Sequence, residues 1–257
     1  MIMRIRQDQM DAFAADGLSR FENDMLLHLR GFAPRHCEVI GEQATREVIR
    51  LGFERALKYQ LIRRGAVRFY IEMMFMLGSA FDTDPQLPWA GETLNDMSVP
   101  YDIDRAEILF DRTAEYFQAT AGENNVFAME SVRRLKRIGL EDCPPPGTDF
   151  TDNVISRLRS TYPQKFDYVG EAVCRYLILR GFKLAGQHSC GVHEGGFVFV
   201  AAMFAMGHGF ATDPLFPWVR ATLTDPLLHD PAQRVRRLVL KMKTYLEAVL
   251  KYLDSEA

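Results

Sequence analysis

Apolar residues recur every three or four positions along most of the chain, whereas the strict alternation of a β-strand is scarce. One such stripe runs from Met10 to Leu29, a second from Ile103 to Phe117 and a third from Val235 to Leu253. This spacing places the apolar side chains on one face of a helix, which other helices must cover. The pattern predicts an all-α protein whose helices pack as a bundle.

One phrase of the sequence occurs twice. FDTDPQLPW begins at Phe81, and FATDPLFPW begins at Phe210, which is 129 positions later. The same offset aligns residues 24–96 with residues 153–225 without a gap, and 22 of these 73 positions are identical. Agreement over this length at a single offset indicates an internal duplication. We therefore expect two pseudo-repeats of one multi-helix unit.

The segment between the two copies has a different composition. Its run Pro144–Gly147 cannot continue a helix and predicts a hinge, whereas Val126–Leu140 has the composition of a short helix. The predicted organisation is a first helical repeat at residues 1–120, a linker at residues 121–150 and a second helical repeat at residues 151–257.

Each copy is predicted to contain two central helices before the repeated phrase. In the first copy they cover Glu42–Tyr59 and Val67–Gly78. Gly52 and Gly181 occupy matching positions inside the first of these helices, where glycine costs about 1 kcal/mol relative to alanine. Because this unfavourable choice is repeated, it predicts a close helix crossing in each copy.

The repeated phrase favours a structural role over a chemical one. Asp84 and Asp213 each precede a proline, which predicts a carboxylate at a helix N-cap with proline at the first helical position. Trp89 and Trp218 would then bury their rings and fix the corner. Two alternatives stay open. All four residues could contact a partner protein, or the two aspartates could be the paired carboxylates of an active site.

The clearest difference between the copies is the turn before the second central helix. In the second copy it carries His188, Cys190 and His193, which are side chains that zinc accepts, and a thiol beside a histidine could also act as a nucleophile. A fourth metal ligand and a third catalytic group are both lacking in the pattern. An ordinary polar turn is therefore favoured, and no metal, cofactor or catalytic residue is predicted.

Composition and charge narrow the classes of partner. The chain has 257 residues and a formal net charge of −3, which favours neither nucleic acid nor an anionic membrane. The longest apolar run, Phe197–Met206, is about half the length of a membrane-spanning helix. The start of the chain lacks the apolar region of a secretory signal, so a cytoplasmic location is expected. Basic clusters at Arg133–Arg137 and in the last helix could contact nucleic acid, although solvated helix faces are favoured.

The segments MRIRQDQM, GFERALKY and FMLGSAFDTDPQLPWA resemble a group of uncharacterised bacterial proteins that accompany type VI secretion and polymorphic-toxin genes. The resemblance covers mainly Met3 to Asp96, and its distinctive core is FDTDPxLPW. It implies a secretion-associated accessory role, as an immunity protein or an effector adaptor. It supplies no catalytic residues.

These observations lead to one functional hypothesis and one alternative. The hypothesis is a non-enzymatic accessory protein that binds a toxin, an effector or a secretion component. The alternative is a metal-binding protein or small hydrolase that uses His188, Cys190 and His193.

Overall fold

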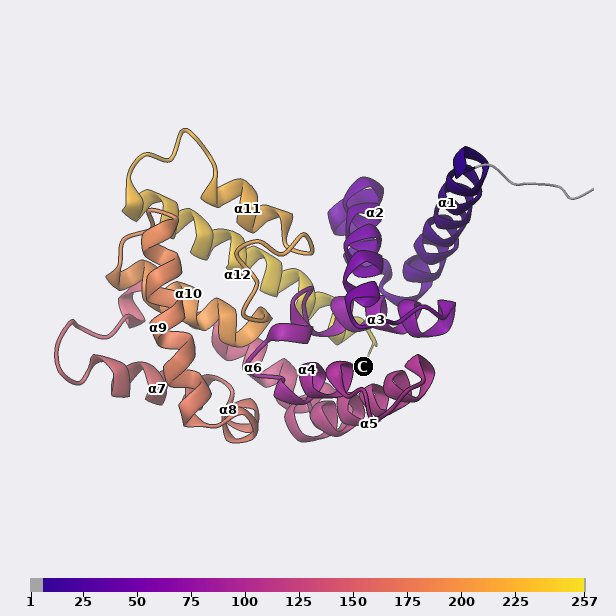
Figure 1. Cartoon of the computed structure of the whole chain (residues 1–257). Helices are drawn as coiled ribbons and strands as arrows, with labels where there is room; N and C mark the ends of the chain where they lie inside the picture. Colours follow the sequence, from indigo (N-terminus) through magenta and orange to yellow (C-terminus); the bar gives the residue numbers. More distant parts are fainter. Residues whose placement is uncertain (1–6, 257) are drawn as a thin grey trace, which may run out of the picture.

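The computed structural model describes residues 7–256, and the side chains of residues 17–252. Within these residues the chain forms twelve α-helices, joined by loops and short 3-10 turns, and no β-strand (Figure 1). The all-α prediction is confirmed. Met10, Ala14 and Leu253, which begin and end two of the predicted stripes, lie outside the described side chains. The helices are α1 (Gln7–Phe32), α2 (Pro34–Lys58), α3 (Arg64–Leu77), α4 (Pro88–Asn95), α5 (Asp102–Thr120), α6 (Val126–Arg137), α7 (Phe150–Thr161), α8 (Pro163–Val169), α9 (Glu171–Gln187), α10 (His193–Met206), α11 (Pro217–Leu223) and α12 (Pro231–Glu256).

The buried apolar side chains form two clusters. One is contributed by α1–α5, which we term the first half, and the other by α6–α12, the second half. Leu215 is the exception, because it precedes α11 and yet packs into the cluster of the first half. In Figure 1, α1, α2 and α3 lie on the right, while α7, α9, α10 and α11 lie on the left. Within residues 7–256, none of the helices combines the length and apolar character needed to cross a membrane.

The linker segment is packed rather than extended. Leu135 of α6 is buried in the second cluster, and Lys136 Nζ lies 3.6 Å from Glu247 Oε2 on α12. Arg134 pairs with Glu130 on its own helix, so part of the predicted basic surface is neutralised. The loop at residues 145–147, which follows α6, is exposed.

Glycines set the path of the central helices. Gly41 interrupts α2 with φ 79°, and Gly170 separates α8 from α9 with φ 83°, a left-handed region that favours glycine. Further along, a Cβ on Gly52 would lie 2.6 Å from Ile71 Cγ1. A Cβ on Gly181 would lie 2.6 Å from Val200 Cγ2. The predicted close crossings are confirmed, between α2 and α3 and between α9 and α10.

An arginine holds the turn that follows α2 in the first half and α9 in the second, Arg105 fully buried and Arg234 half-buried. Arg105 donates from Nη2 to the Tyr59 carbonyl at 2.9 Å, and Arg234 donates from Nη1 to the His188 carbonyl at 2.9 Å. Each arginine and its acceptor lie 129 positions from their counterparts. The two turns therefore have the same support, although their side chains differ.

The close crossing in the second half predicts opposite effects for two glycines on α9. Gly181→Ala should destabilise the fold by about 1 to 3 kcal/mol, because the new methyl group would overlap Val200. Gly186→Ala should stabilise it by about 0.5 to 1 kcal/mol, because nothing lies within 4 Å of the added Cβ and alanine favours a helix. Urea unfolding of both variants measures the two free-energy changes, and equal effects would show that the crossing is not tight.

Candidate functional site

The two copies of the repeated phrase meet at the junction between the halves. Asp84 Oδ2 accepts a hydrogen bond from the backbone N–H of His208 at 2.7 Å. Asp213 Oδ2 accepts one from the backbone N–H of Ser79 at 2.8 Å. The carboxylates are buried, with exposed fractions of 3% and 4%. Each half thus supplies a carboxylate that satisfies a backbone donor in the other half.

The second oxygen of each carboxylate is used locally. Asp84 Oδ1 accepts from the N–H of Gln86 at 2.9 Å, and Asp213 Oδ1 accepts from the N–H of Leu215 at 2.9 Å. This pattern is an Asx turn, which reverses the chain without starting a helix. The prediction that these aspartates are helix N-caps is therefore wrong. The following helices α4 and α11 begin four residues after the aspartates, at Pro88 and Pro217.

The junction also requires glycine where α3 and α10 end. Gly78 has φ 96° and Gly207 has φ 95°. A Cβ on Gly78 would lie 3.1 Å from the Met206 carbonyl oxygen, and a Cβ on Gly207 would lie 3.2 Å from the Leu77 carbonyl oxygen. A larger residue at either position would press against the opposite helix end and would also have to adopt a positive φ, which favours glycine.

The two tryptophans lie within the protein. Trp89 is buried and its ring centroid lies 6.2 Å from that of Tyr116, while Trp218 is half-buried and lies 5.9 Å from Tyr245. With Asp84 and Asp213, these are the residues predicted as candidate partner contacts. In the structure these four side chains make contacts within the protein. The rings pack on tyrosines, and the carboxylates accept hydrogen bonds from backbone N–H groups.

Removing an aspartate at the junction should destabilise the protein more than removing the aspartate of an exposed Asx turn. Asp84→Ala should lower the free energy of unfolding by about 2 to 3 kcal/mol, because it leaves buried N–H donors of both halves without an acceptor. The control is Asp96→Ala, because Asp96 accepts from the N–H of Ser98 in the same way but is exposed.

Chemical denaturation measures both variants together with Asp213→Ala and the double variant Asp84→Ala/Asp213→Ala. The double variant should lose less than the sum of the single losses, since both residues support one junction. Equal losses for Asp84→Ala and Asp96→Ala would contradict the assigned role.

The structure does not assemble the candidate metal or thiol site. Cys190 is buried with Sγ directed at the His188 carbonyl, and burial raises the pKa of the thiol to about 11. His193 Nε2 lies 2.8 Å from the Pro144 carbonyl oxygen, and the His188 ring stacks on Phe199. Within the described part of the chain, no three His, Cys, Asp or Glu side chains are grouped to hold a metal ion.

A buried polar cluster in the first half was not foreseen. Asp82 accepts hydrogen bonds from the hydroxyls of Tyr59 at 3.0 Å and Tyr70 at 2.8 Å, and Arg55 Nη1 lies 3.7 Å from its other oxygen. Burial, reinforced by the Asp82 charge, raises the pKa of Tyr59 to about 12. The sequence feature that could have revealed this cluster is the difference between Asp82 and Ala211 at the second position of the repeated phrase. The other positions of the cluster are also apolar or aromatic in the second half: Leu184, His188 and Phe199.

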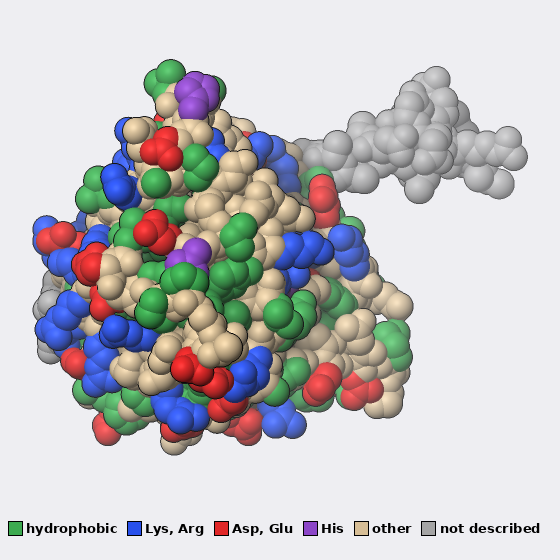
Figure 2. Space-filling model, turned by 90° about the vertical axis from the view of Figure 1, so that its left-hand side faces the viewer, with side chains coloured by type: hydrophobic (Ala, Val, Ile, Leu, Met, Phe, Trp, Pro, Cys, Tyr) green, Lys and Arg blue, Asp and Glu red, His purple; other side chains and the backbone are tan. Residues whose placement is uncertain are grey.

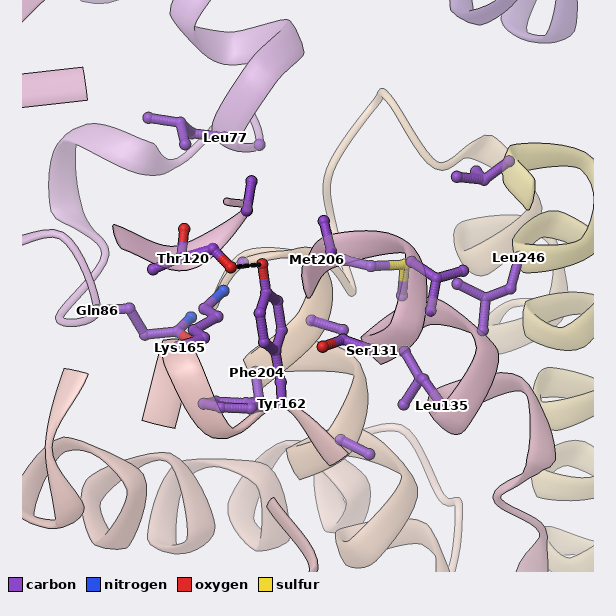
Figure 3. Close-up of a pocket in the computed structure, with 18 of the residues that line it drawn as sticks. Leu77, Gln86, Thr120, Ser131, Leu135, Tyr162, Lys165, Phe204, Met206 and Leu246 are labelled. Carbon is purple, nitrogen blue, oxygen red and sulfur yellow. Dashed lines mark hydrogen bonds between the residues drawn. The ribbon is translucent and has the colours of Figure 1, made fainter. Parts of the chain in front are cut away.

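A cavity of about 320 Å³ lies where the two halves meet. Its polar end contains Lys165, Gln86, Tyr162 and Thr120 (Figure 3). The Tyr162 hydroxyl donates to the Thr120 carbonyl at 3.0 Å, which links α7 to the end of α5. Apolar side chains from both halves line the rest: Leu77, Leu135, Phe204, Met206 and Leu246.

Lys165 is the unusual residue of this cavity. Only 6% of it is exposed, yet its ammonium forms no hydrogen bond or ion pair with a described residue. Its Nζ lies over the Phe204 ring, 5.4 Å from the ring centroid. Burial lowers the pKa of Lys165, and the Asp84 carboxylate opposes that effect. No sequence pattern indicates this site, because its residues come from segments that are distant along the chain.

The residue of the first half that corresponds to Lys165 has a hydrogen-bond partner. His36 lies 129 residues earlier, and its Nε2 is 3.0 Å from the Leu215 carbonyl oxygen of the second half. Burial lowers the pKa of His36, so the neutral ring is favoured. The two halves thus place different polar groups at matching points of the junction.

An open groove of about 500 Å³ lies between α3 and α5 of the first half. Phe69, Ile103 and Phe110 form its apolar floor, and 59% of Phe110 is exposed. Its rim carries Arg68 and Glu72, which pair at 2.9 Å, together with the exposed carboxylates Glu107 and Asp111. The charged side chains of the rim that form no ion pair with a described residue are therefore the two acidic ones.

The end of the molecule formed by the second half has a different surface. Figure 2 shows apolar side chains near the middle of this face, with acidic and basic side chains around them.

Comparisons of the chain with protein families, with curated proteins and with solved structures found no match.

Proposed function

We propose that the chain is a non-enzymatic accessory protein that binds another protein, as an immunity protein or an effector adaptor linked to type VI secretion does. The groove between α3 and α5 is the observation that carries this proposal. The resemblance of residues 3–96 to companions of secretion and toxin genes supports the same class. A toxin, an effector or a secretion component would be the partner.

The proposal includes an origin by duplication, with repeats at residues 1–120 and 151–257 and a linker at residues 121–150. Several contacts support it because both partners shift by 129 positions. These are the aspartate bonds across the junction, the glycine crossings and the arginine bonds to the turns. The α3/α5 groove does not follow this rule, since Phe110 is exposed and the matching residue of the second half, Val239, is buried. A duplicated scaffold that carries one unmatched surface suits a binding protein.

The groove favours a protein segment with particular chemistry. An exposed aromatic ring beside an apolar floor provides the anchor contact on which protein interfaces depend. Glu107 and Asp111 lie one helical turn apart on α5, and neither pairs with a described residue. A helix or extended segment with an apolar anchor flanked by Lys or Arg complements this surface.

The metal or hydrolase alternative has less support. Cys190 is buried as a protonated thiol, and His188 and His193 have other contacts. A nucleophile needs an adjacent base and access to its substrate. We therefore do not put this alternative forward.

Affinity purification of the tagged chain from its host should recover a stoichiometric protein partner. Phe110→Glu should weaken that complex about tenfold or more, because it places a charge on the apolar floor beside the acidic rim. The control is Leu179→Glu on α9, which is 74% exposed and distant from the groove along the chain. Titration of the purified partner by isothermal calorimetry measures both affinities.

Absence of any stoichiometric partner would count against the function. Loss of binding in Leu179→Glu but not in Phe110→Glu would move the interface to the second half. Co-expression with the partner then separates the two roles. An immunity protein should restore growth to cells that produce a toxic partner, whereas an adaptor should be required only for its secretion.

A further inference from the structure

The cavity at the junction has the organisation of a ligand site. Its volume of about 320 Å³ is at the lower end of the range for small-molecule pockets. Figure 3 shows Lys165, Gln86, Tyr162 and Thr120 at one end, and Leu135, Met206 and Leu246 toward the other. A molecule that fills it would need one polar end and one apolar end.

Lys165 determines the chemistry of the polar end. A buried ammonium is costly unless an acceptor or an opposite charge compensates for the lost water. Within the described residues its Nζ forms neither a hydrogen bond nor an ion pair. The neighbouring Tyr162 hydroxyl already donates to the Thr120 carbonyl, and the Gln86 amide donates to the Met203 carbonyl at 3.0 Å. The lysine is therefore the donor that is left for a ligand.

Two further features define the charge of that ligand. Lys165 is the cationic group at the polar end, and the other basic side chain of the lining, Arg157, already pairs with Asp142 at 3.5 Å. Sites for phosphate or dicarboxylate usually combine several donors or a bidentate arginine. The carboxylate of Asp84 also lines the cavity, so a second negative charge on the ligand would be repelled. A single negative charge fits both constraints.

We propose that this cavity binds a small monocarboxylate with an apolar chain, of the size of a medium-chain fatty acid. The carboxylate pairs with the Lys165 ammonium, and the chain lies among Leu135, Met206 and Leu246. The site is separate from the α3/α5 groove and does not depend on the proposed protein partner. Because both halves line it, the ligand would bridge the junction and stabilise their association.

Isothermal calorimetry with decanoate, decanol and decylammonium tests the charge requirement on the unmodified chain. Decanoate should bind at least about tenfold more tightly than decanol, because only the anion forms a charge-assisted hydrogen bond with the lysine. Decylammonium should not bind measurably, since it would place a second cation beside Lys165. Acetate, which lacks the chain, should bind about tenfold or more weakly than decanoate.

Lys165→Met tests the named residue while it retains an apolar stem of similar length. It should weaken decanoate binding roughly 10- to 100-fold and leave decanol binding unchanged. The matched control is Lys183→Met on α9, an exposed lysine that does not line the cavity and should change neither affinity. Circular dichroism before each titration verifies that the variants are folded.

Several outcomes would overturn the proposal. They are no decanoate binding to the unmodified chain, equal affinities for decanoate and decanol, and equal losses in Lys165→Met and Lys183→Met. If Lys165→Met does not fold, the comparison of the three ten-carbon ligands on the unmodified chain still decides the question. Decanoate should also raise the melting temperature of the unmodified chain, and the same concentration of decanol should raise it less.

Discussion

The carboxylates of Asp84 and Asp213 each accept a backbone N–H from the opposite half of the molecule. A buried carboxylate is tolerated only where hydrogen-bond donors replace its lost water, and here the donors come from two segments that are distant in sequence. Each aspartate also holds its own turn through its second oxygen. One side chain thus fixes a local turn and the contact between the halves, so neither can shift alone.

The packing around these bonds explains which residues the two copies share. Gly78 and Gly207 end the central helices where a Cβ would meet the opposing backbone, and the arginines hold the preceding turns. Away from these constraints the copies differ. The first half buries Asp82 under two tyrosine hydroxyls, whereas the second half places Ala211 at that point. The positions that differ include Asp82, Lys165 in the cavity and Phe110 in the α3/α5 groove.

The points at which the sequence-based expectations were wrong, left alternatives open or missed a feature have a common physical cause. An aspartate before proline is a good local signal for a helix N-cap, but the signal cannot include a donor from another part of the chain. His188, Cys190 and His193 are close in sequence, yet the turn directs them toward different partners. The cavity around Lys165 left no pattern, because a lysine in an otherwise ordinary helix becomes notable only when it is buried.

The sequence by itself determined the helical class, the approximate positions of the helices and the two close crossings at Gly52 and Gly181. These properties depend on local periodicity and on a repeated unfavourable residue, both of which are visible along the chain. The tertiary structure alone decided what the repeated phrase contacts, that Asp82 is buried beneath two tyrosine hydroxyls, and that Lys165 lies in a cavity. Those outcomes depend on atoms brought together from distant segments, and burial then sets the energy of each polar group.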